Sequence, residues 1–590
     1  MPDFNLIASM KTWLRLLLVT GFYALLFVLF TWPLVTHFTT AFPTVPGRDS
    51  LLYAWNFWYF REAVVNGHNP FYTDWLLYPW GSWLIMHTYM PLLGALNLVL
   101  NNVPLTINSG LLVNYSLSGT GAYLLCRRWV RNPVLCLLAG VIFAYSPYKL
   151  IRLPEHYNLV LTATVPFYVM AFLDAFTFRL GKLLPHVHSR RAVIWCLVLG
   201  WITLLCDYYI TFGLLYFSAA YGLWYLLRLG ELNWSRWQIW LRVALVLLTS
   251  HFFIRLLRIL QVPDNGGPWW GGDVVSYFMP PPTSYFLDFE WAQELYLNPK
   301  VFNMPGSLEM ILFSGYSLLA LGLLVVVWSN RQASARHLDP SGRPLAWVLL
   351  FFMMLTLPTL RINGQETLHL PTCVLHFIPF FNNIRCPTRW VMMVGLFLPL
   401  VLFSRLEALW QPRLRPIQQM AASMALLAVI MIEYWPKAMH LTTTDVPIVY
   451  EEVAKLPGST LFPIPFGMID GYRKIGEVQT EQFFYQAWHR KKLPTGYFSR
   501  IEPRIFTAFQ QDIVVRRLLA LQTYPNAIPP AQPTPTQVTA FLRRYEPAAF
   551  VIDPAYRELP VHVYLRQLLR PYGYREQVIG DYVLLAPPAK

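Results

Sequence analysis

The residues of this chain that can do chemistry stand in connections between long apolar runs. Asp49 follows the first run, and Arg152, Glu155 and His156 share the motif Arg152-Leu-Pro-Glu155-His156. A carboxylate or an imidazole can accept a proton, and the planar guanidinium group of arginine can hold a phosphate. Together, these residue types indicate acid–base chemistry beside an anionic group.

The composition decides which class of protein positions these residues. Of 590 residues, 55% are hydrophobic and only 13% are charged, which is about half the charge of an average soluble domain. The mean hydropathy is +0.39. These values exclude a disordered protein, a coiled coil and a soluble cytosolic enzyme. They predict a mostly α-helical, polytopic membrane protein with room for one modest soluble domain.

Long apolar runs predict a bundle of about eleven membrane-crossing helices. The runs cover about 16–35, 108–126, 133–149, 159–177, 192–209, 210–228, 239–259, 309–328, 345–360, 390–404 and 418–435. Lysine and arginine clusters follow every second run, on the same side as Lys11 and Arg15. This pattern predicts a cytoplasmic N-terminus. It also accounts for the net charge of +15 without a nucleic-acid partner.

With eleven spans, residues 436–590 lie outside the cytoplasm. This stretch has more proline and charge and contains no run of spanning length. Strand-like runs at Ser459–Ile464, Ala549–Ile552 and Tyr582–Ala586, with a helix at about 536–545, predict a small α/β domain. We therefore expect a membrane domain at 1–435 and an extracytoplasmic domain at 436–590.

The first outer connection, about 36–107, is too long to be a simple link. The aromatic-rich segment from Asp49 to Arg61 indicates a helix lying in the membrane interface. The apolar segment Met90–Val103 indicates a second surface or re-entrant helix. We assign this whole connection to the membrane domain.

Further charge gathers on the same outer side. Arg385 and Arg389 end the fifth outer connection, and Arg255 and Arg258 lie on the outer side of their span. Charge on this side departs from the positive-inside pattern, and such departures are often functional.

This organisation resembles the GT-C superfamily of membrane glycosyltransferases, across most of the chain. Asp49 matches the acid that follows the first span, and Arg152-Leu-Pro-Glu155-His156 matches the motif of the second outer loop. Tyr78-Pro-Trp-Gly81 and Ile384-Arg-Cys-Pro-Thr-Arg389 resemble segments of large bacterial GT-C-like proteins. The chain departs from the oligosaccharyltransferase pattern, because its second loop has no Asp-x-Asp.

The resemblance implies inverting transfer of a sugar from a polyprenyl-phosphate donor to a glycan, lipid or protein outside the cytoplasm. An acceptor hydroxyl must lose a proton, so the resemblance suggests Asp49 as general base, assisted by Glu155 or His156. The leaving phosphate needs cations, for which Arg152, Arg385 and Arg389 are candidates. It also implies a bacterial inner-membrane protein of the cell envelope, surrounded by membrane lipids.

Other interpretations of the same residues stay open. Asp49 can simply cap a helix, and Glu155 can pair with Arg152. Arg255 and Arg258, three residues apart, suit either phosphate binding or contact with lipid headgroups. His87 is a further candidate for substrate binding.

Metal and disulfide chemistry have weaker signals. Asp49, His87 and His156 could converge on a divalent metal, but the chain has no HxxxH or HExxH spacing. We expect no cofactor and no essential metal. Cys373 and Cys386 fall in one outer connection, where pairing is open.

Two rival functions remain. A transporter or flippase for an envelope precursor would be expected to show internal repeats and central charges in its spans, and we find little of either. A non-catalytic envelope-assembly protein would use the C-terminal domain to bind a partner, and the sequence does not exclude it.

Overall fold

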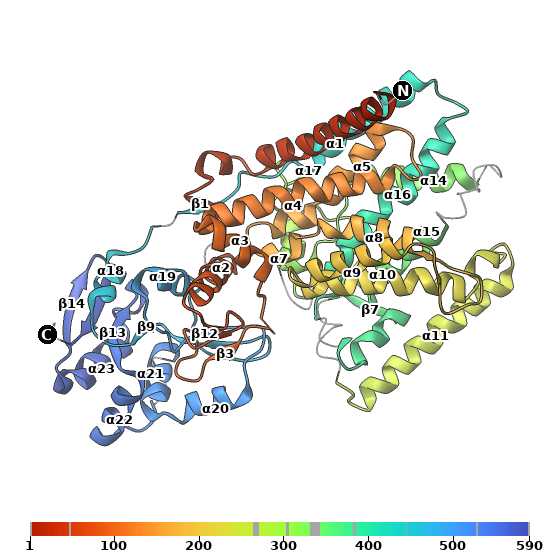
Figure 1. Ribbon diagram of the computed structural model, residues 1–590. Helices are drawn as coiled ribbons and strands as arrows, with labels where there is room; N and C mark the ends of the chain where they lie inside the picture. Colours follow the sequence, from red (N-terminus) through yellow and green to blue (C-terminus); the bar gives the residue numbers. More distant parts are fainter. Residues whose placement is uncertain are drawn as a thin grey trace. The chain divides into compact units, whose positions relative to one another are not determined.

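The computed structural model describes residues 3–45, 49–85, 87–263, 271–302, 306–330, 343–381, 385–443, 445–524, 526 and 529–587. The chain forms two compact units. Unit 1 comprises 1–36 and 109–439, and unit 2 comprises 37–108 and 440–590. Helix α4 (Val103–Cys126) runs from the second unit into the first (Figure 1).

Unit 1 is a bundle of helices. Its helices are α1 (Asp3–Phe30), α5 (Pro133–Ala144), α6 (Pro147–Arg152), α7 (Tyr157–Val160), α8 (Thr164–Ala175), α9 (Arg190–Leu204), α10 (Tyr208–Leu226), α11 (Trp237–Ile259), α12 (Glu290–Leu297), α13 (Ser307–Met310), α14 (Tyr316–Asn330), α15 (Arg343–Thr356), α16 (Val391–Trp410) and α17 (Pro416–Tyr434). Short 3-10 helices are η1 (Leu34–His37), which ends at the unit boundary, η2 (Leu229–Glu231), η3 (Val274–Tyr277), η5 (Pro371–Phe377) and η7 (Pro387–Trp390). Two small hairpins pair β4 (Phe176–Thr177) with β5 (His186–Val187) and β6 (Thr359–Ile362) with β7 (Gln365–His369).

Five helical segments among the described residues are long and apolar enough to cross a membrane. They are Trp13–Phe30, Pro133–Arg152, Trp237–Ile259, Pro387–Trp410 and Pro416–Tyr434. Together with the composition, these segments make the chain an integral membrane protein. The other six predicted runs fall in helices that miss the length or the hydropathy, such as α8 with 12 residues and α15 with 14. The count of eleven spans stays a prediction.

Buried carboxylates hold the starts of several helices in unit 1. Glu407, near the end of α16, accepts hydrogen bonds from the backbone N–H groups of Arg131 and Asn132, just before α5. Glu433, near the end of α17, accepts from the N–H of Ser317 in the first turn of α14. Asp207 caps α10 through the N–H of Ile210. The orphan donors at a helix start need such partners in an apolar surrounding, so these acids have a structural role.

Unit 2 contains a four-stranded sheet with the order β14-β15-β13-β9. Its strands are β9 (Thr460–Ile464), β13 (Pro547–Ile552), β14 (Arg575–Ile579) and β15 (Tyr582–Ala586). Strands β9 and β13 are parallel, with Phe462 opposite Phe550, and the other pairs are antiparallel. The sheet has strands at all three places predicted from the sequence. Every residue of β9 and β13 is buried, which explains their continuous apolar runs.

Helices and smaller sheets complete unit 2. The helices are α2 (Ser50–Val65), α3 (Pro91–Leu100), α18 (Ile448–Lys455), α19 (Glu481–His489), α20 (Pro503–Gln511), α21 (Ile513–Thr523), α22 (Pro535–Tyr545), α23 (Pro560–Leu569) and the 3-10 helices η8 (Pro554–Tyr556) and η9 (Arg570–Tyr572). A three-stranded sheet joins β10 (Gly467–Ile469), β11 (Lys474–Gly476) and β12 (Gly496–Tyr497). Two pairs join β1 (Ala41–Pro43) to β8 (Leu441–Thr443), and β2 (Tyr72–Thr73) to β3 (Ser82–Trp83).

The first long connection folds with the C-terminal stretch, not with the membrane helices as the sequence led us to expect. Helix α2 packs on α19, and Trp55 Nε1 donates a 2.6 Å hydrogen bond to Gln486 Oε1. The N–H groups of Leu77 and Tyr78 bond to the carbonyl groups of Thr495 and Leu493. The aromatic residues of α2 therefore form part of a buried core. We predicted a helix lying in the membrane interface, whereas these aromatic residues pack inside unit 2.

This shared core predicts a long-range effect of Trp55→Ala. Trp55 is 1% exposed and belongs to the same core as Phe550 of β13. Removing a buried indole costs about 3–5 kcal/mol, so amide hydrogen exchange in β13 should accelerate at least about 100-fold. Mass spectrometry of exchange measures this. Trp83→Ala, at a 52% exposed tryptophan of the same connection, should leave β13 unchanged. Faster exchange confined to α2 would contradict a common core.

Candidate functional site

Two arginines lie at the same end of two antiparallel segments that are long and apolar enough to cross a membrane. Glu407 near the end of α16 contacts the start of α5, so the two segments run in opposite directions. Arg152 ends the segment Pro133–Arg152, and Arg389 lies in the first turn of the segment Pro387–Trp410. Both guanidinium groups therefore lie at one end of these two segments, and Glu407 lies at the other end.

The carboxylate of Glu309 joins these arginines. Arg152 Nη1 and Nη2 donate to Glu309 Oε1 and Oε2 at 2.9 and 2.6 Å. Arg389 Nη2 and Nε donate to the same oxygens at 2.6 and 3.2 Å. Each arginine thus makes a paired contact with one carboxylate, which fixes both planes. We call Arg152, Glu309 and Arg389 the arginine triad.

Aromatic rings orient the two guanidinium groups further. The guanidinium carbon of Arg152 lies 5.2 Å from the ring centre of Tyr148, and that of Arg389 lies 4.8 Å from the ring centre of Tyr209. Arg152 Nη2 also donates to the carbonyl of Leu308 at 2.7 Å. These contacts preorganise the triad before any ligand arrives.

The triad carries one more positive than negative charge in a buried setting. The Arg152 side chain is fully buried, whereas those of Glu309 and Arg389 are 14% and 15% exposed. Among the described residues, no group accepts from Arg152 Nε, and the Tyr148 hydroxyl group also has no partner. A buried surplus cation is unfavourable unless an anion balances it. The arrangement therefore suits an anionic ligand entering beside Arg389.

Glu309 acts as a fixed negative charge in the triad. Burial alone would raise the pKa of its carboxyl group, but Arg152 and Arg389 outweigh burial and hold that pKa well below its ordinary value. A carboxylate with so low a proton affinity is a poor general base. Glu309 was not among the predicted site residues, because it stands at the first position of an apolar run. The sequence signal that could have identified Glu309 is its position as an acidic residue at the end of a predicted span.

Of the predicted residues in unit 1, Glu155 and His156 lie closest in sequence to Arg152. Their backbone N–H groups donate to the Arg152 carbonyl at 3.0 and 2.7 Å, and both side chains are half-buried. The turn therefore fixes them to the arginine that precedes it. Arg385 stands two residues before η7 and is half-buried. Arg255 and Arg258 lie on α11.

Asp49 and His87 belong to unit 2. Asp49 occupies the position before α2, but its side chain makes no capping hydrogen bond there, so helix capping does not explain this acid. His87 is 3% exposed, with its ring 4.9 Å from that of Phe498. Burial lowers the pKa of His87 to about 3, so the imidazole is uncharged at neutral pH. We leave it out of the proposed site.

The described residues contain no group of three or more metal-binding side chains, and the expectation of a metal-independent protein stays a prediction. Cys373 and Cys386 are both buried. Cys373 packs with Ile254 and Phe377, whereas Cys386 is three residues from Arg389. No disulfide joins them in this structure.

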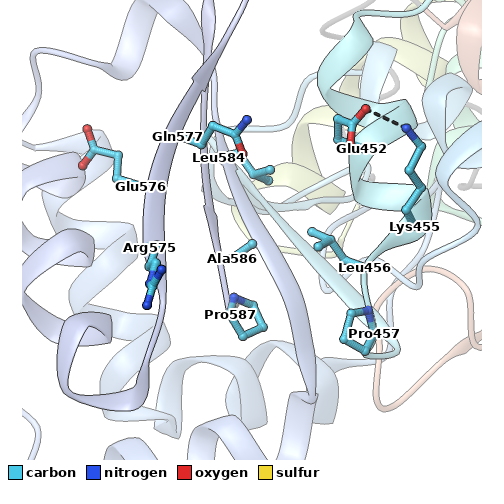
Figure 2. A pocket seen from close by; sticks show the side chains of 10 residues that line it. All are labelled: Glu452, Lys455, Leu456, Pro457, Arg575, Glu576, Gln577, Leu584, Ala586 and Pro587. Atoms are coloured by element: carbon cyan, nitrogen blue, oxygen red, sulfur yellow. Dashed lines mark hydrogen bonds and ion pairs between the residues drawn. The ribbon is translucent and has the colours of Figure 1, made fainter. Parts of the chain in front are cut away.

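Unit 2 has an open groove of about 840 Å³ between α18 and the edge formed by β14 and β15 (Figure 2). Glu452 and Lys455 pair with each other across 2.7 Å on one wall. Glu576 on the opposite wall lies 3.4 Å from His562 Nε2. Glu452, Lys455 and Glu576 therefore have partners among the described residues, and Arg575 also lines the groove.

Comparisons with known proteins give structural neighbours only. No family model and no curated protein matches the chain. The chain is similar to the oligosaccharyltransferase of Archaeoglobus fulgidus in the apo form, with 12% identity, a TM-score of 0.42, and coverage of 92% of this chain and 70% of that chain. It is also similar to AglB from the same organism in complex with an inhibitory peptide and a dolichol-phosphate. That match has 13% identity, a TM-score of 0.35, and coverage of 93% and 70%. At this level of similarity, function has to be inferred from the side chains of the site.

The triad makes Glu309→Gln a destabilising change. Loss of the carboxylate leaves two buried guanidinium groups without a counter-charge, and breaking a buried ion pair costs about 3–5 kcal/mol. The thermal unfolding midpoint of the detergent-solubilised protein should therefore fall. Glu290→Gln, at an exposed glutamate of α12, is the control and should leave the midpoint unchanged. An equal midpoint in both variants would mean that the triad does not hold the bundle ends together.

The depressed pKa of Glu309 also predicts a pH dependence. Its contribution to stability is complete above the ordinary glutamate pKa of 4.5 and is lost as the pH falls toward the lower folded value. At pH values below about 4.5, the thermal unfolding midpoint of the wild type should decrease more steeply with falling pH than that of Glu309→Gln. Parallel curves in a pH series from 7 to 3 would contradict this assignment.

Proposed function

We propose that the protein is an integral-membrane glycosyltransferase of the GT-C type, which takes a sugar from a lipid-phosphate-linked donor. The observation that carries the proposal is the buried arginine triad with its surplus positive charge. Arg389 is the partly exposed member and would meet the donor phosphate first. Arg152 lies behind it and adds a second positive charge.

The position of the triad suits a lipid-linked donor. Arg152 and Arg389 stand at the ends of membrane-crossing segments, which is where the phosphate of a lipid carrier would lie while its tail stays in the bilayer. Glu309 keeps both guanidinium planes fixed, so little ordering is required when phosphate binds. This geometry favours recognition of a phosphate over recognition of an uncharged sugar.

The reaction would proceed by direct displacement. An acceptor oxygen forms a bond to the anomeric carbon, the bond from that carbon to the phosphate oxygen breaks, and polyprenyl phosphate leaves with the bonding electrons. The acceptor proton passes to a general base, for which Asp49 is our candidate, assisted by Glu155 or His156. Arg389 and Arg152 stabilise the charge that grows on the leaving phosphate. Displacement in one step inverts the anomeric centre.

The remaining features of the proposal come from the sequence. We place the reaction on the extracytoplasmic face of a bacterial inner membrane, with the N-terminus in the cytoplasm and residues 436–590 outside. The donor would be a polyprenyl-phosphate sugar, and the acceptor a glycan, lipid or protein of the cell envelope.

The test is release of polyprenyl phosphate from a panel of polyprenyl-phosphate sugars by the purified protein in nanodiscs, with a cell-envelope extract as the acceptor source. Arg389→Gln should raise the donor KM about 10- to 100-fold, because a charged hydrogen-bond donor to phosphate is lost. Arg389→Lys keeps the charge but not the paired geometry, so its donor KM should lie between those of the wild type and Arg389→Gln. Arg128→Gln, which removes an arginine paired with Asp174, is the control and should behave as wild type.

A second variant tests the general base. Asp49→Asn should lower kcat about 100- to 10,000-fold while donor binding is retained, because the amide cannot accept the acceptor proton. Thermal unfolding and size-exclusion profiles establish that each variant is folded. Full activity of Asp49→Asn would move the base to Glu155 or His156. Absence of release with every donor, from folded wild-type protein, would contradict the transferase and favour transport or assembly.

A further inference from the structure

Helix α11 presents its apolar side chains to the surroundings along most of its length. Ile239 and Ile254 are its buried residues, whereas Trp240, Leu245 and Phe252 are each more than half exposed. The segment is long and apolar enough to cross a membrane, so lipid is the surrounding that suits this surface. Its C-terminal half is held by β7 and η5 (Figure 1).

Basic side chains form one stripe on this C-terminal half. His251, Arg255 and Arg258 follow one another at spacings of four and three residues, which places them on one face of the helix. Arg255 and Arg258 lie within about 6 Å of the helix end along its axis. In a helix that spans a hydrocarbon layer of about 30 Å, this depth is the level of the lipid headgroups.

The contacts of Arg258 are long, and Arg255 has more open surroundings. Arg258 Nη1 lies 3.4 Å from Glu366 Oε2 and 3.4 Å from His369 Nε2. Arg255 is exposed, and no other described residue makes a hydrogen bond or ion pair with it. Glu366 is 42% exposed at its side chain, so it screens only part of the positive charge.

The histidines beside the stripe fix its shape. The rings of His251 and His369 stack with centres 4.9 Å apart, and His251 Nδ1 accepts from the backbone N–H of His369 at 3.2 Å. Burial and the neighbouring Arg258 lower the pKa of His369 to about 4. Arg255, Arg258 and Glu366 together carry one net positive charge, on a face rimmed by Phe252, Leu256 and Ile259.

We propose that Arg255 and Arg258 bind the phosphate of an anionic phospholipid at the membrane boundary beside α11. The apolar rim favours a lipid over free phosphate, because acyl chains cover exposed Phe252, Leu256 and Ile259 while the headgroup meets the guanidinium groups. This site goes beyond the proposed transferase reaction and is measured without any sugar donor, so either proposal can fail alone.

The experiment uses the full-length protein in a neutral detergent. Dioctanoyl-phosphatidylglycerol is titrated while the thermal unfolding midpoint is followed, and dioctanoyl-phosphatidylcholine and inorganic phosphate are the reference probes. We expect a saturable rise in the midpoint with phosphatidylglycerol alone. The double variant Arg255→Gln/Arg258→Gln should require at least about tenfold more lipid for the same rise, as expected for loss of charged hydrogen bonds.

Matched variants separate a site from general attraction. Arg242→Gln removes an exposed arginine near the other end of the same helix and should titrate as wild type. The single variant Arg255→Gln, which removes no hydrogen bond or ion pair among the described residues, tests the site even if the double variant fails to fold. An equal effect of phosphatidylcholine, an equal rise with inorganic phosphate, or an equal loss in Arg242→Gln would each overturn the proposal.

Discussion

A carboxylate held between two guanidinium groups ties together three segments of unit 1 that are far apart in sequence. Glu309 comes from the short helix α13, Arg152 from the end of α6 and Arg389 from the 3-10 helix before α16. In an apolar bundle these charges are tolerable only together, because each alone would be buried without a partner. Their pairing fixes where α6, α13 and α16 meet at one end of the bundle, and the candidate site follows from that meeting point.

The other buried acids of the bundle satisfy backbone groups and leave the arginines to the triad. Glu407 and Glu433 accept from N–H groups at the starts of α5 and α14, and Asp273 accepts from Val275, Asn363 and Gly364. A carboxylate bound to three N–H groups is already well satisfied. Because these acids accept from backbone N–H groups and the triad contains the paired arginines, the triad is the candidate for binding an external anion.

The local features of this chain were predictable from its sequence, and the long-range ones were not. Continuous apolar runs indicated β9, β13 and β15 and the five helices that can cross a membrane, because periodicity and length are local signals. Glu309 was missed because its role depends on two arginines more than 75 residues away. Helix α2 was predicted to begin after Asp49 but was placed in the wrong surroundings. Its aromatic residues suit a membrane interface and a protein core equally well, and the packing of Trp55 on α19 is what decides between them.

Through that packing, the C-terminal stretch positions Asp49 within unit 2. Asp49 lies between β1 and α2, and both flanking elements are held by residues from the far end of the chain. Strand β1 pairs with β8 through Phe42 and Thr442, and α2 is fixed by the hydrogen bond from Trp55 to Gln486. Asp49 directly precedes α2, so its position is set by the packing of α2 on α19, within residues 441–489. A chain shortened before this region would keep the arginine triad of unit 1 but would lose the elements that position its candidate general base.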